Sequence, residues 1–286
     1  MSSRRTLLAT AAAAVAMGLI GCAVVPTAPA SQPATSPATE SSTPTAPALS
    51  FVVGSDGHLG DPEAPGNPYP QFVATVNALN ARQPLDVVIL NGDLAQGGVA
   101  LARQVKATLD GLAVPYVVVP GNHDELSPTQ WREVWGSAPN QVRRFGARSI
   151  VLATTSNAAG ELLCPDEAWL RRALAGEAGQ SDVLVFLHIT PKDWTRYGVD
   201  CPGVRKLFAA TPNLRAVFNG HDHDQDGQLV EHGVHYLFDA HLGGHWGTTY
   251  AGFRLTTLQA GELHSRMMEL DGTPLPETRI SWRPGE

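Results

Sequence analysis

Five short segments of the sequence carry histidine, aspartate or asparagine directly after a run of apolar residues. They are Asp-Gly-His at 56–58, Gly-Asp at 92–93, Gly-Asn-His-Asp at 121–124, the single residue His188, and Gly-His-Asp-His at 220–223. Imidazole nitrogens together with carboxylate and amide oxygens suit Zn, Fe, Mn, Co or Ni, whereas a cysteine-based structural zinc site would need clustered thiolates. The chemistry that these residue types could perform together is the binding of transition-metal ions.

One such segment alone would not distinguish a metal site from a polar loop that turns the chain. The apolar runs before the segments are short and rich in β-branched residues, as strands are, and amphipathic segments at 69–82 and 99–112 separate the first three runs. Strands that alternate with helices favour parallel pairing through crossover connections. Because parallel strands present ligands at their carboxyl ends, we expect all five segments to meet at one rim of the fold.

The remaining apolar segments complete the expected fold. Three further strands are expected between residues 149 and 223, and segments 251–259 and 262–270 alternate apolar and polar residues as antiparallel strands do. Neither an internal repeat nor a linker divides residues 50–286. The sequence therefore predicts a single α/β domain that contains two sheets.

The number of candidate ligands indicates how many ions the site would hold. Seven side chains of the five segments qualify, and they are Asp56, His58, Asp93, Asn122, His188, His221 and His223. One tetrahedral or octahedral ion would not use seven ligands and leave room for a substrate. The set instead suits two ions about 3.5–4 Å apart that share a carboxylate.

The order and approximate spacing of the five segments resemble the motif set of the calcineurin-like metallophosphoesterases. The resemblance extends from Phe51 to about Leu270. It implies a two-sheet β-sandwich flanked by helices, in four layers, and the metal-dependent hydrolysis of a phosphomonoester or a phosphodiester. A small phosphorylated molecule would then be the substrate.

The resemblance also implies a role for each of these residues. One metal ion would be held by Asp56, His58 and His223, the other by Asn122, His188 and His221, and Asp93 would bridge the two. Hydroxide activated by both ions would attack phosphorus. His123 would face the substrate, and Asp124 would orient His123 and keep it protonated.

Two further features bear on this interpretation. The related purple acid phosphatases have a tyrosine three residues after the aspartate that corresponds to Asp93, and here that position is Gln96, so a tyrosinate-to-iron colour is not expected. His241 and His245 fall in a glycine-rich loop that could border the site and touch the substrate. The alternative function is a catalytically silent metal- or ligand-binding envelope lipoprotein on the same fold. The absence of some of the metal-ligating residues would be its signature, and none of these residues is absent.

The N-terminus has the pattern of an export signal. Arg4 and Arg5 precede an apolar run over 7–20, which is shorter than the roughly 20 residues of a membrane-spanning helix. Residues 1–21 are therefore expected to form a signal peptide of the twin-arginine type. The run ends in Leu-Ile-Gly-Cys, which resembles a bacterial lipobox and predicts lipidation of Cys22, although an ordinary signal peptide with a chance cysteine is the alternative.

Residues 22–49 consist mostly of proline, alanine, serine and threonine. A segment of this composition buries too little apolar area to offset its ordering entropy, so we expect a disordered tether. The predicted folded domain then comprises residues 50–286. The whole protein would be exported to the bacterial cell envelope and held by its lipid anchor on the outer side of the cytoplasmic membrane.

Charge and cysteine content give two more expectations. The formal net charge is -7, without the basic footprint of nucleic-acid-binding proteins, so a nucleic-acid partner is not expected. Apart from Cys22 the chain has two cysteines, Cys164 and Cys201. In an exported protein such a pair predicts a disulfide, with two free, half-buried thiols as the alternative.

Overall fold

A computed structural model describes residues 48–283 of the chain. The expected signal peptide at 1–21, the lipidation site Cys22 and all but the last two residues of the expected tether at 22–49 lie outside the described residues. Leu49, which the sequence assigned to the tether, is buried and begins the first strand. None of the helices within residues 48–283 combines the length and the apolar character that crossing a membrane requires.

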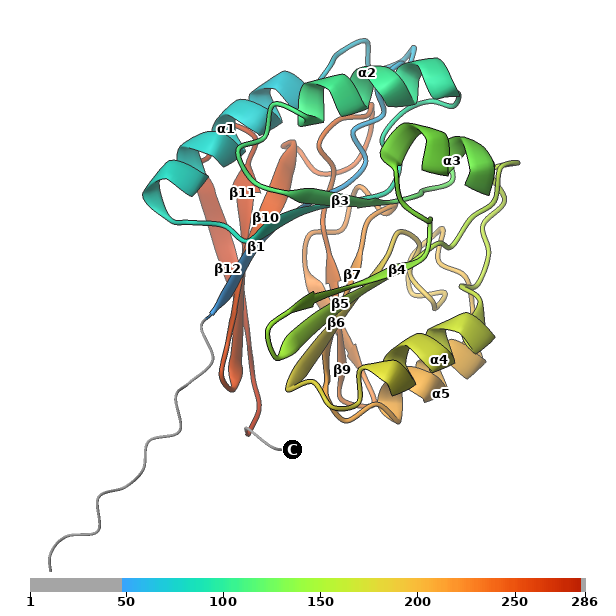
Figure 1. The fold of residues 1–286 in the computed structure, drawn as a ribbon. Helices are drawn as coiled ribbons and strands as arrows, with labels where there is room; N and C mark the ends of the chain where they lie inside the picture. The colour runs from blue at the N-terminus through green and yellow to red at the C-terminus, as the bar shows by residue number, and fades with distance from the viewer. Residues whose placement is uncertain (1–47, 284–286) are drawn as a thin grey trace, which may run out of the picture. The chain divides into compact units, whose positions relative to one another are not determined.

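The first sheet has six strands in the order β12-β11-β10-β1-β2-β3. Its strands are β1 (Leu49–Gly54), β2 (Val87–Asn91), β3 (Tyr116–Val119), β10 (Gly252–Gln259), β11 (Glu262–Glu269) and β12 (Pro274–Ser281). β1, β2 and β3 are parallel, whereas β10, β11 and β12 form an antiparallel meander that joins the sheet through β1. The carboxyl ends of β1, β2 and β3 therefore lie at one edge (Figure 1).

The second sheet also has six strands, in the order β4-β5-β6-β7-β9-β8. They are β4 (Gln141–Phe145), β5 (Arg148–Ala153), β6 (Asp182–Leu187), β7 (Leu214–Asn219), β8 (Gln228–Glu231) and β9 (Val234–Phe238). The four central strands β5, β6, β7 and β9 are parallel, and β4 and β8 add antiparallel edges. The loops after β6, β7 and β9 consequently share one end of this sheet.

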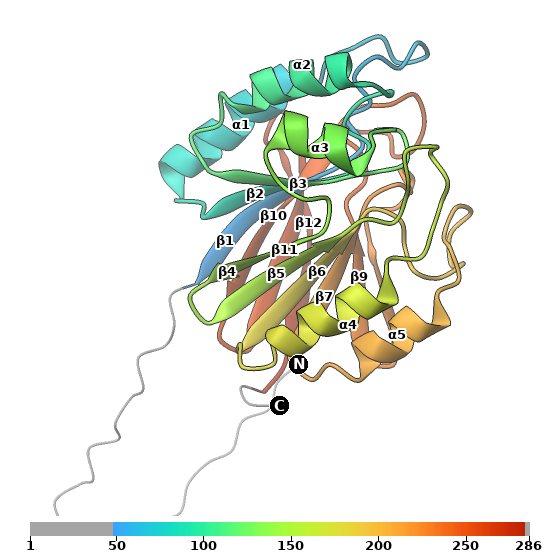
Figure 2. The ribbon, with the colours of Figure 1, turned by 45° about the vertical axis from the view of Figure 1, so that its right-hand side comes forward.

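Five helices cover the outer faces of the two sheets. The first sheet carries α1 (Tyr69–Arg82), α2 (Val99–Leu109) and α3 (Pro128–Trp135), and the second carries α4 (Glu167–Gly176) and α5 (Pro202–Ala209). Figures 1 and 2 show the resulting order of helices, sheet, sheet and helices. The predicted α/β fold with two sheets flanked by helices in four layers is confirmed.

The central core lies between the sheets and contains side chains from strands of both. Successive residues of a strand point to opposite faces, so Phe51 and Val53 of β1 enter this core while Val52 packs under the helices. The ring of Phe51 contacts those of Phe186 and Phe218 edge-on, at centroid distances of 6.2 and 5.8 Å. Burial on both faces explains why these strands are continuous apolar runs.

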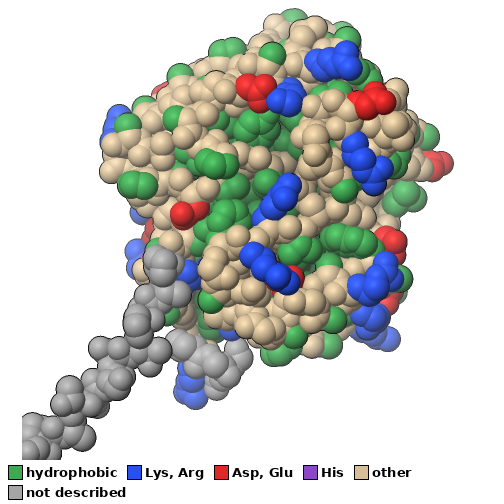
Figure 3. Space-filling view, in the orientation of Figure 1, with side chains coloured by type: hydrophobic (Ala, Val, Ile, Leu, Met, Phe, Trp, Pro, Cys, Tyr) green, Lys and Arg blue, Asp and Glu red, His purple; other side chains and the backbone are tan. Residues whose placement is uncertain are grey.

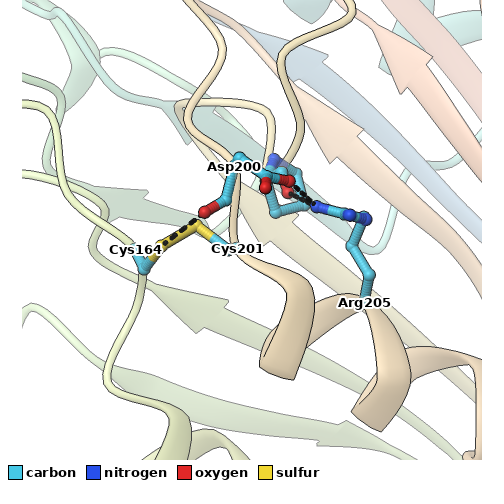
Figure 4. Close-up of a disulfide and its surroundings, with 5 residues drawn as sticks. Cys164, Asp200, Cys201 and Arg205 are labelled. Carbon is cyan, nitrogen blue, oxygen red and sulfur yellow. Dashed lines mark hydrogen bonds and ion pairs between the residues drawn. A yellow bond between two sulfur atoms is a disulfide. The ribbon is translucent and has the colours of Figure 1, made fainter.

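The predicted disulfide between Cys164 and Cys201 is present, with Cα atoms 5.7 Å apart (Figure 4). Cys164 is exposed in the loop between β5 and α4, and Cys201 is buried at the start of α5. Asp200, next to Cys201, forms an ion pair with Arg205 of α5. The bond thus joins two loops that both follow strands of the second sheet.

Removal of this disulfide should destabilise the fold without changing it. Closing a loop with a sequence separation of 37 residues restricts the unfolded chain, so replacing both cysteines by serine should lower the free energy of unfolding by about 4 kcal/mol. Urea unfolding followed by circular dichroism measures this change. Reductant should lower the midpoint of the parental protein similarly and leave the serine variant unaffected; equal midpoints for both proteins would contradict the expectation.

Candidate metal centre

All five predicted segments converge at the carboxyl ends of the parallel strands. Residues 55–58 follow β1, 92–93 follow β2, 120–124 follow β3, His188 follows β6 and 220–223 follow β7. The seven candidate ligands are all buried there. Within the described part of the chain, potential metal-ligating groups gather in three overlapping sets whose ligand atoms lie within 4.8 Å of one another, and all three belong to this rim.

The first set consists of Asp56, His58 and His223. His223 Nε2 lies 3.2 Å from Asp56 Oδ1 and 3.0 Å from His58 Nε2, and His58 Nε2 lies 3.7 Å from Asp56 Oδ1. Two imidazole nitrogens and a carboxylate oxygen therefore face one small volume. This is the donor set that the sequence assigned to the first ion.

The second set consists of Asp93, His188 and His221, and Asn122 lies beside it. Asn122 Oδ1 and His221 Nε2 are buried, yet neither atom has a hydrogen-bond partner, and His188 Nε2, also buried, faces the carboxylate of Asp93 at 3.1 Å. Leaving buried polar atoms unsatisfied is costly. The two unpartnered atoms are of the ligand types that transition metals prefer, and together with the facing Asp93–His188 pair they fit a cation as the missing partner.

Asp93, a member of the second set, also faces the first set. Its Oδ2 atom is 3.7 Å from His58 Nε2 and 3.1 Å from His188 Nε2, which belong to different sets. The other carboxylate oxygen accepts a hydrogen bond from the backbone N–H of His123 at 2.7 Å. One oxygen is therefore held by the backbone, and the other faces both groups of imidazoles.

Neighbouring carbonyl groups orient two of the imidazoles. His188 Nδ1–H donates to the carbonyl oxygen of Asn91 at 2.7 Å, and His223 Nδ1 lies 3.2 Å from the carbonyl oxygen of Trp246. This arrangement directs each Nε2 atom toward the carboxylates, as is usual for histidines that bind metals. Asn91 also donates through Nδ2 to Asp239 Oδ2 at 3.0 Å. Sequence reasoning missed Asn91, although a polar residue ending a buried apolar run was a visible signal.

The backbone at the centre is strained. Among the described residues, four of the seven non-glycine residues with positive φ are candidate ligands, namely Asp56, His58, Asp93 and His221, with φ between 45° and 67°. Left-handed backbone is unfavourable for residues with a Cβ atom and concentrates at functional sites. Gly92, at φ 92°, has a further constraint because a Cβ atom there would overlap the ring of His188.

The electrostatics of the buried centre favour a cation. Burial acts to raise the pKa of Asp56 and Asp93, but neighbouring histidines, above all His188, hold the pKa of both carboxyls below the usual range. Burial likewise opposes protonation of His188, but Asp93 and Asp56 raise its pKa to about 10. The burial of His221 and the charge of His188 lower the pKa of His221 to about 4. Positive charge is thus strongly stabilised between the two carboxylates.

The predicted pairing of Asp124 with His123 is wrong. Asp124 Oδ1 accepts backbone hydrogen bonds from Leu94 and Ala95 at 3.0 and 3.2 Å, and Oδ2 accepts one from Gly121 at 2.8 Å. Asp124 therefore fastens the loop after β3 to the loop after β2. Burial lowers the pKa of His123, so the histidine is also not held in its protonated form.

Gln96, rather than Asp124, is the side chain that contacts the imidazole of His123. Gln96 Oε1 lies 2.8 Å from His123 Nδ1, and Gln96 Nε2 lies 3.1 Å from His58 Nδ1. One amide therefore connects a candidate metal ligand with the histidine expected to face the substrate. The sequence marked Gln96 only as a departure from a tyrosine, and nothing in its local pattern indicated this bridging position.

A cavity of roughly 280 Å³ opens over the centre. The residues that line it include His123, Gln96 and Asn122. They also include Tyr197 and Trp246, whose rings contact each other. The wall also includes Leu162, Asp61 and candidate ligands from both sets.

The two histidines of the glycine-rich loop differ in position. His245 lines the cavity, with Nδ1 2.9 Å from Asp61 Oδ2 and Nε2 3.2 Å from Glu63 Oε2. His241 is buried and stacks on His223 at a centroid distance of 5.2 Å, and it is absent from the described cavity wall. The expectation of a substrate-facing position therefore fits His245 but not His241, which packs behind a candidate ligand.

Comparison with known proteins identifies the family of a chain with this fold and this buried group of potential metal ligands. The calcineurin-like phosphoesterase family model matches residues 49–225, and the chain belongs to this family. Members of the family depend on metal ions, in agreement with the residues gathered here that could hold them.

Individual relatives show similarity over part or most of the chain. A glycerophosphodiester phosphodiesterase, GpdQ of Enterobacter lignolyticus, is 29% identical over 178 residues, which cover 53% of this chain and 60% of that protein. The chain thus spans less than two thirds of that relative. The fold is similar to that of a dimetal phosphatase from Danio rerio, with a TM-score of 0.65 and 15% identity over 82% of this chain and 99% of the other. The fold is also similar to that of GAP50 of Plasmodium, with a TM-score of 0.61 and 9% identity over 82% of this chain and 89% of the other.

Replacing Asp124 by asparagine should weaken metal binding rather than act through His123. The substituted amide exchanges an acceptor for a donor, so at least one backbone N–H of the joined loops loses its partner. We expect the affinity for Zn²⁺ or Mn²⁺ to fall roughly 10- to 100-fold, as measured by isothermal titration calorimetry. Glu125→Gln, which alters the adjacent exposed carboxylate, is the matched control. Parental metal affinity combined with a lower turnover in Asp124→Asn would instead restore the pairing with His123.

Proposed function

We propose that this protein is a phosphoric ester hydrolase that uses two divalent transition-metal ions and acts on phosphodiesters. The observation that carries the proposal is the pair of buried donor sets whose histidines both face Asp93 Oδ2, together with the unpartnered atoms of Asn122 and His221. Asp56, His58 and His223 would hold one ion, and Asn122, His188 and His221 would hold the other. When bound, such ions would polarise the phosphoryl group and lower the pKa of the attacking water.

The charge of the cavity favours a diester over a monoester. No lysine or arginine is among the described residues that line it, and its wall includes the carboxylate of Asp61. A phosphomonoester dianion carries a second negative charge, which a lysine or arginine side chain would help to neutralise, whereas a phosphodiester carries a single negative charge. The similarity to a glycerophosphodiester phosphodiesterase supports the same choice. On the face shown in Figure 3, lysine and arginine side chains are interspersed with acidic and apolar ones.

His123 is the side chain best placed to assist the leaving group. An imidazole that binds metal through Nε2 carries its proton on Nδ1, so a metal-bound His58 must donate a hydrogen bond to the amide of Gln96. The Gln96 amide, whose oxygen and nitrogen can exchange places by rotation, would then accept from His58 and donate to His123 Nδ1. The proton of neutral His123 is thereby placed on Nε2, from which it can donate a hydrogen bond that stabilises the negative charge developing on the leaving oxygen.

The N-terminal segment and the cysteines support export of the protein to the cell envelope. Structural disulfides persist in oxidising compartments, and the Cys164–Cys201 bond supports export of the protein. Anchoring through Cys22 on the outer side of the cytoplasmic membrane is part of the same proposal and rests on the sequence pattern alone.

Metal removal tests the function directly. Protein stripped with a chelator should lose hydrolysis of bis(4-nitrophenyl) phosphate and regain it when Zn²⁺, Mn²⁺ or Co²⁺ is restored, with about two ions bound per chain by elemental analysis. Hydrolysis of 4-nitrophenyl phosphate should be slower, because the second charge of the monoester lacks a partner. Two bound ions without turnover of either ester would favour the silent binding protein, and the absence of bound metal would exclude both functions.

The roles of His123 and Gln96 give a second, separate test. His123→Ala should retain its metal content and lower kcat about 10²- to 10⁴-fold. Gln96→Leu, which can neither set the position of the His123 proton nor bond His58, should lower kcat about tenfold when assayed at metal concentrations that saturate the centre. In the His123→Ala background the Gln96 substitution should have little further effect, because it acts through the missing imidazole. Parental kcat in His123→Ala would refute the assignment.

A further inference from the structure

We propose that Tyr197, Trp246 and Leu162 form a wall that binds an apolar or aromatic alcohol group of the substrate, and that the Cys164–Cys201 disulfide holds this wall in place. We refer to these three residues as the apolar wall. The inference rests on the proposed phosphodiester hydrolysis and specifies which esters the same site selects.

The apolar wall begins directly at the candidate metal ligands. The Trp246 ring stacks on the imidazole of His223 at a centroid distance of 4.4 Å and an interplanar angle of 12°. Tyr197 contacts the imidazole of His221 edge-on at 5.7 Å and the Trp246 ring at 5.7 Å. His223 and His221 belong to different donor sets. A group esterified to a phosphate at the centre would therefore extend along these rings.

The chemistry of the wall matches an uncharged, apolar group. Trp246 is 36% exposed, which is unusual for so large an apolar side chain and leaves ring surface for a ligand. Leu162 adds an aliphatic surface to the same cavity. Since the described cavity wall contains Asp61 but neither lysine nor arginine, a substituent with an additional phosphate or carboxylate group would be disfavoured.

Two of the three wall residues lie in loops that the disulfide connects. Leu162 is two residues before Cys164 in the loop between β5 and α4, and Tyr197 is four residues before Cys201 in the loop between β6 and α5. Near the strand ends the same loops are joined by the backbone N–H of Ile189, which donates to Thr155 Oγ1 at 3.0 Å.

The disulfide supplies the second point of attachment at the far end of the loops. Loops without regular structure move readily unless they are tied down. Within the individual loops, Leu163 N–H donates to Thr155 O at 2.8 Å and Val199 N–H donates to Thr190 O at 3.1 Å. The Ile189–Thr155 hydrogen bond and the disulfide join the two loops to each other, so Tyr197 and Leu162 lie between two attachments that link the loops. Cutting the disulfide should therefore release the wall while the ligands at the strand ends stay in place.

A pair of diesters with one leaving group tests the wall. Bis(4-nitrophenyl) phosphate places an aryl group on the second oxygen, and methyl 4-nitrophenyl phosphate places a methyl group there. In the parental metal-loaded protein the aryl diester should have the lower KM, by about fivefold. Tyr197→Ala should raise the KM of the aryl diester to near that of the methyl diester, and Tyr197→Phe, which keeps the ring, should restore the preference for the aryl diester.

A double-mutant cycle tests the positioning role of the disulfide. Cys164→Ser combined with Cys201→Ser should raise the KM of the aryl diester several-fold and leave the KM of the methyl diester and the metal content unchanged. When Tyr197 is already alanine, the serine substitutions should have little further effect on KM. Additive effects, or equal effects on both diesters, would show that the disulfide does not act through the wall. If the serine variant does not fold, the parental protein with its disulfide reduced provides the same comparison. The assay is then run at a temperature below the unfolding midpoint of the reduced protein.

Inhibitor binding separates this inference from the proposed function. Calorimetry should show that phenylphosphonate binds the metal-loaded protein more tightly than methylphosphonate, and that Tyr197→Ala removes the difference. If that preference is found but neither diester is hydrolysed, the proposed function fails and the wall stands. If both diesters are hydrolysed with equal KM and both phosphonates bind equally, the function stands and the wall is refuted.

Discussion

Asp56 and Asp93 are buried carboxylates that face the same group of imidazoles, and the repulsion between their charges is the constraint on which the site depends. Burial, and to a smaller extent the charge of Asp56, act to raise the pKa of Asp93. A buried carboxylate is tolerated only when hydrogen bonds and opposite charge compensate its lost hydration. One oxygen of each accepts a backbone N–H, from His221 and His123 respectively. The remaining compensation must come from positive charge between them, which protons on imidazole or metal ions can supply.

This arrangement requires a backbone that cannot yield to the repulsion. The loops after β1 and β2 continue the parallel pairing of their strands, because Asp56 N–H donates to Gly92 O and His58 N–H donates to Asp93 O, both at 3.0 Å. Asp124 adds the loop after β3 to this assembly. The left-handed φ angles of the ligands persist because these bonds and the packed sheets beneath them over-determine the conformation. The donor atoms are thus placed before any ion arrives, which lowers the entropic cost of binding.

The sequence was most informative where burial and chemistry leave the same signal. Strands buried on both faces are continuous apolar runs, and a ligand at the end of each run is conspicuous, so the sheets, the rim and all seven candidate ligands could be located. Edge elements such as β4, β8 and β12 were missed because partial exposure mixes polar residues into their patterns. α3 was also missed, although Ser127 and Gln130 form a capping box that marks its start. Helix α2 ends at Leu109, before the expected Leu112, because Gly111 lies in the turn that follows it.

Contacts between side chains of distant loops left no comparable signal. The family resemblance implied that Asp124 orients His123, but adjacent residues at a strand end point in different directions, so Asp124 turns to the backbone of the β2 loop. Gln96 then reaches His123 from another loop, and only the three-dimensional fold brings the two together. The same holds for Tyr197 and Trp246, which are separated by 49 positions and meet over the centre.

The centre and the cavity wall above it are therefore stabilised by different means. The ligands sit at the ends of strands whose hydrogen bonds and core packing fix them, so their geometry is a property of the two sheets. Tyr197 and Leu162 sit in loops outside those ladders, where a covalent link between Cys164 and Cys201 provides the rigidity that strand pairing provides below. Because the two supports share few residues, the loops can change length and composition without disturbing the donor atoms. A fold built in this way can keep one hydrolytic centre while the group that it accepts beside the phosphate varies with the loops.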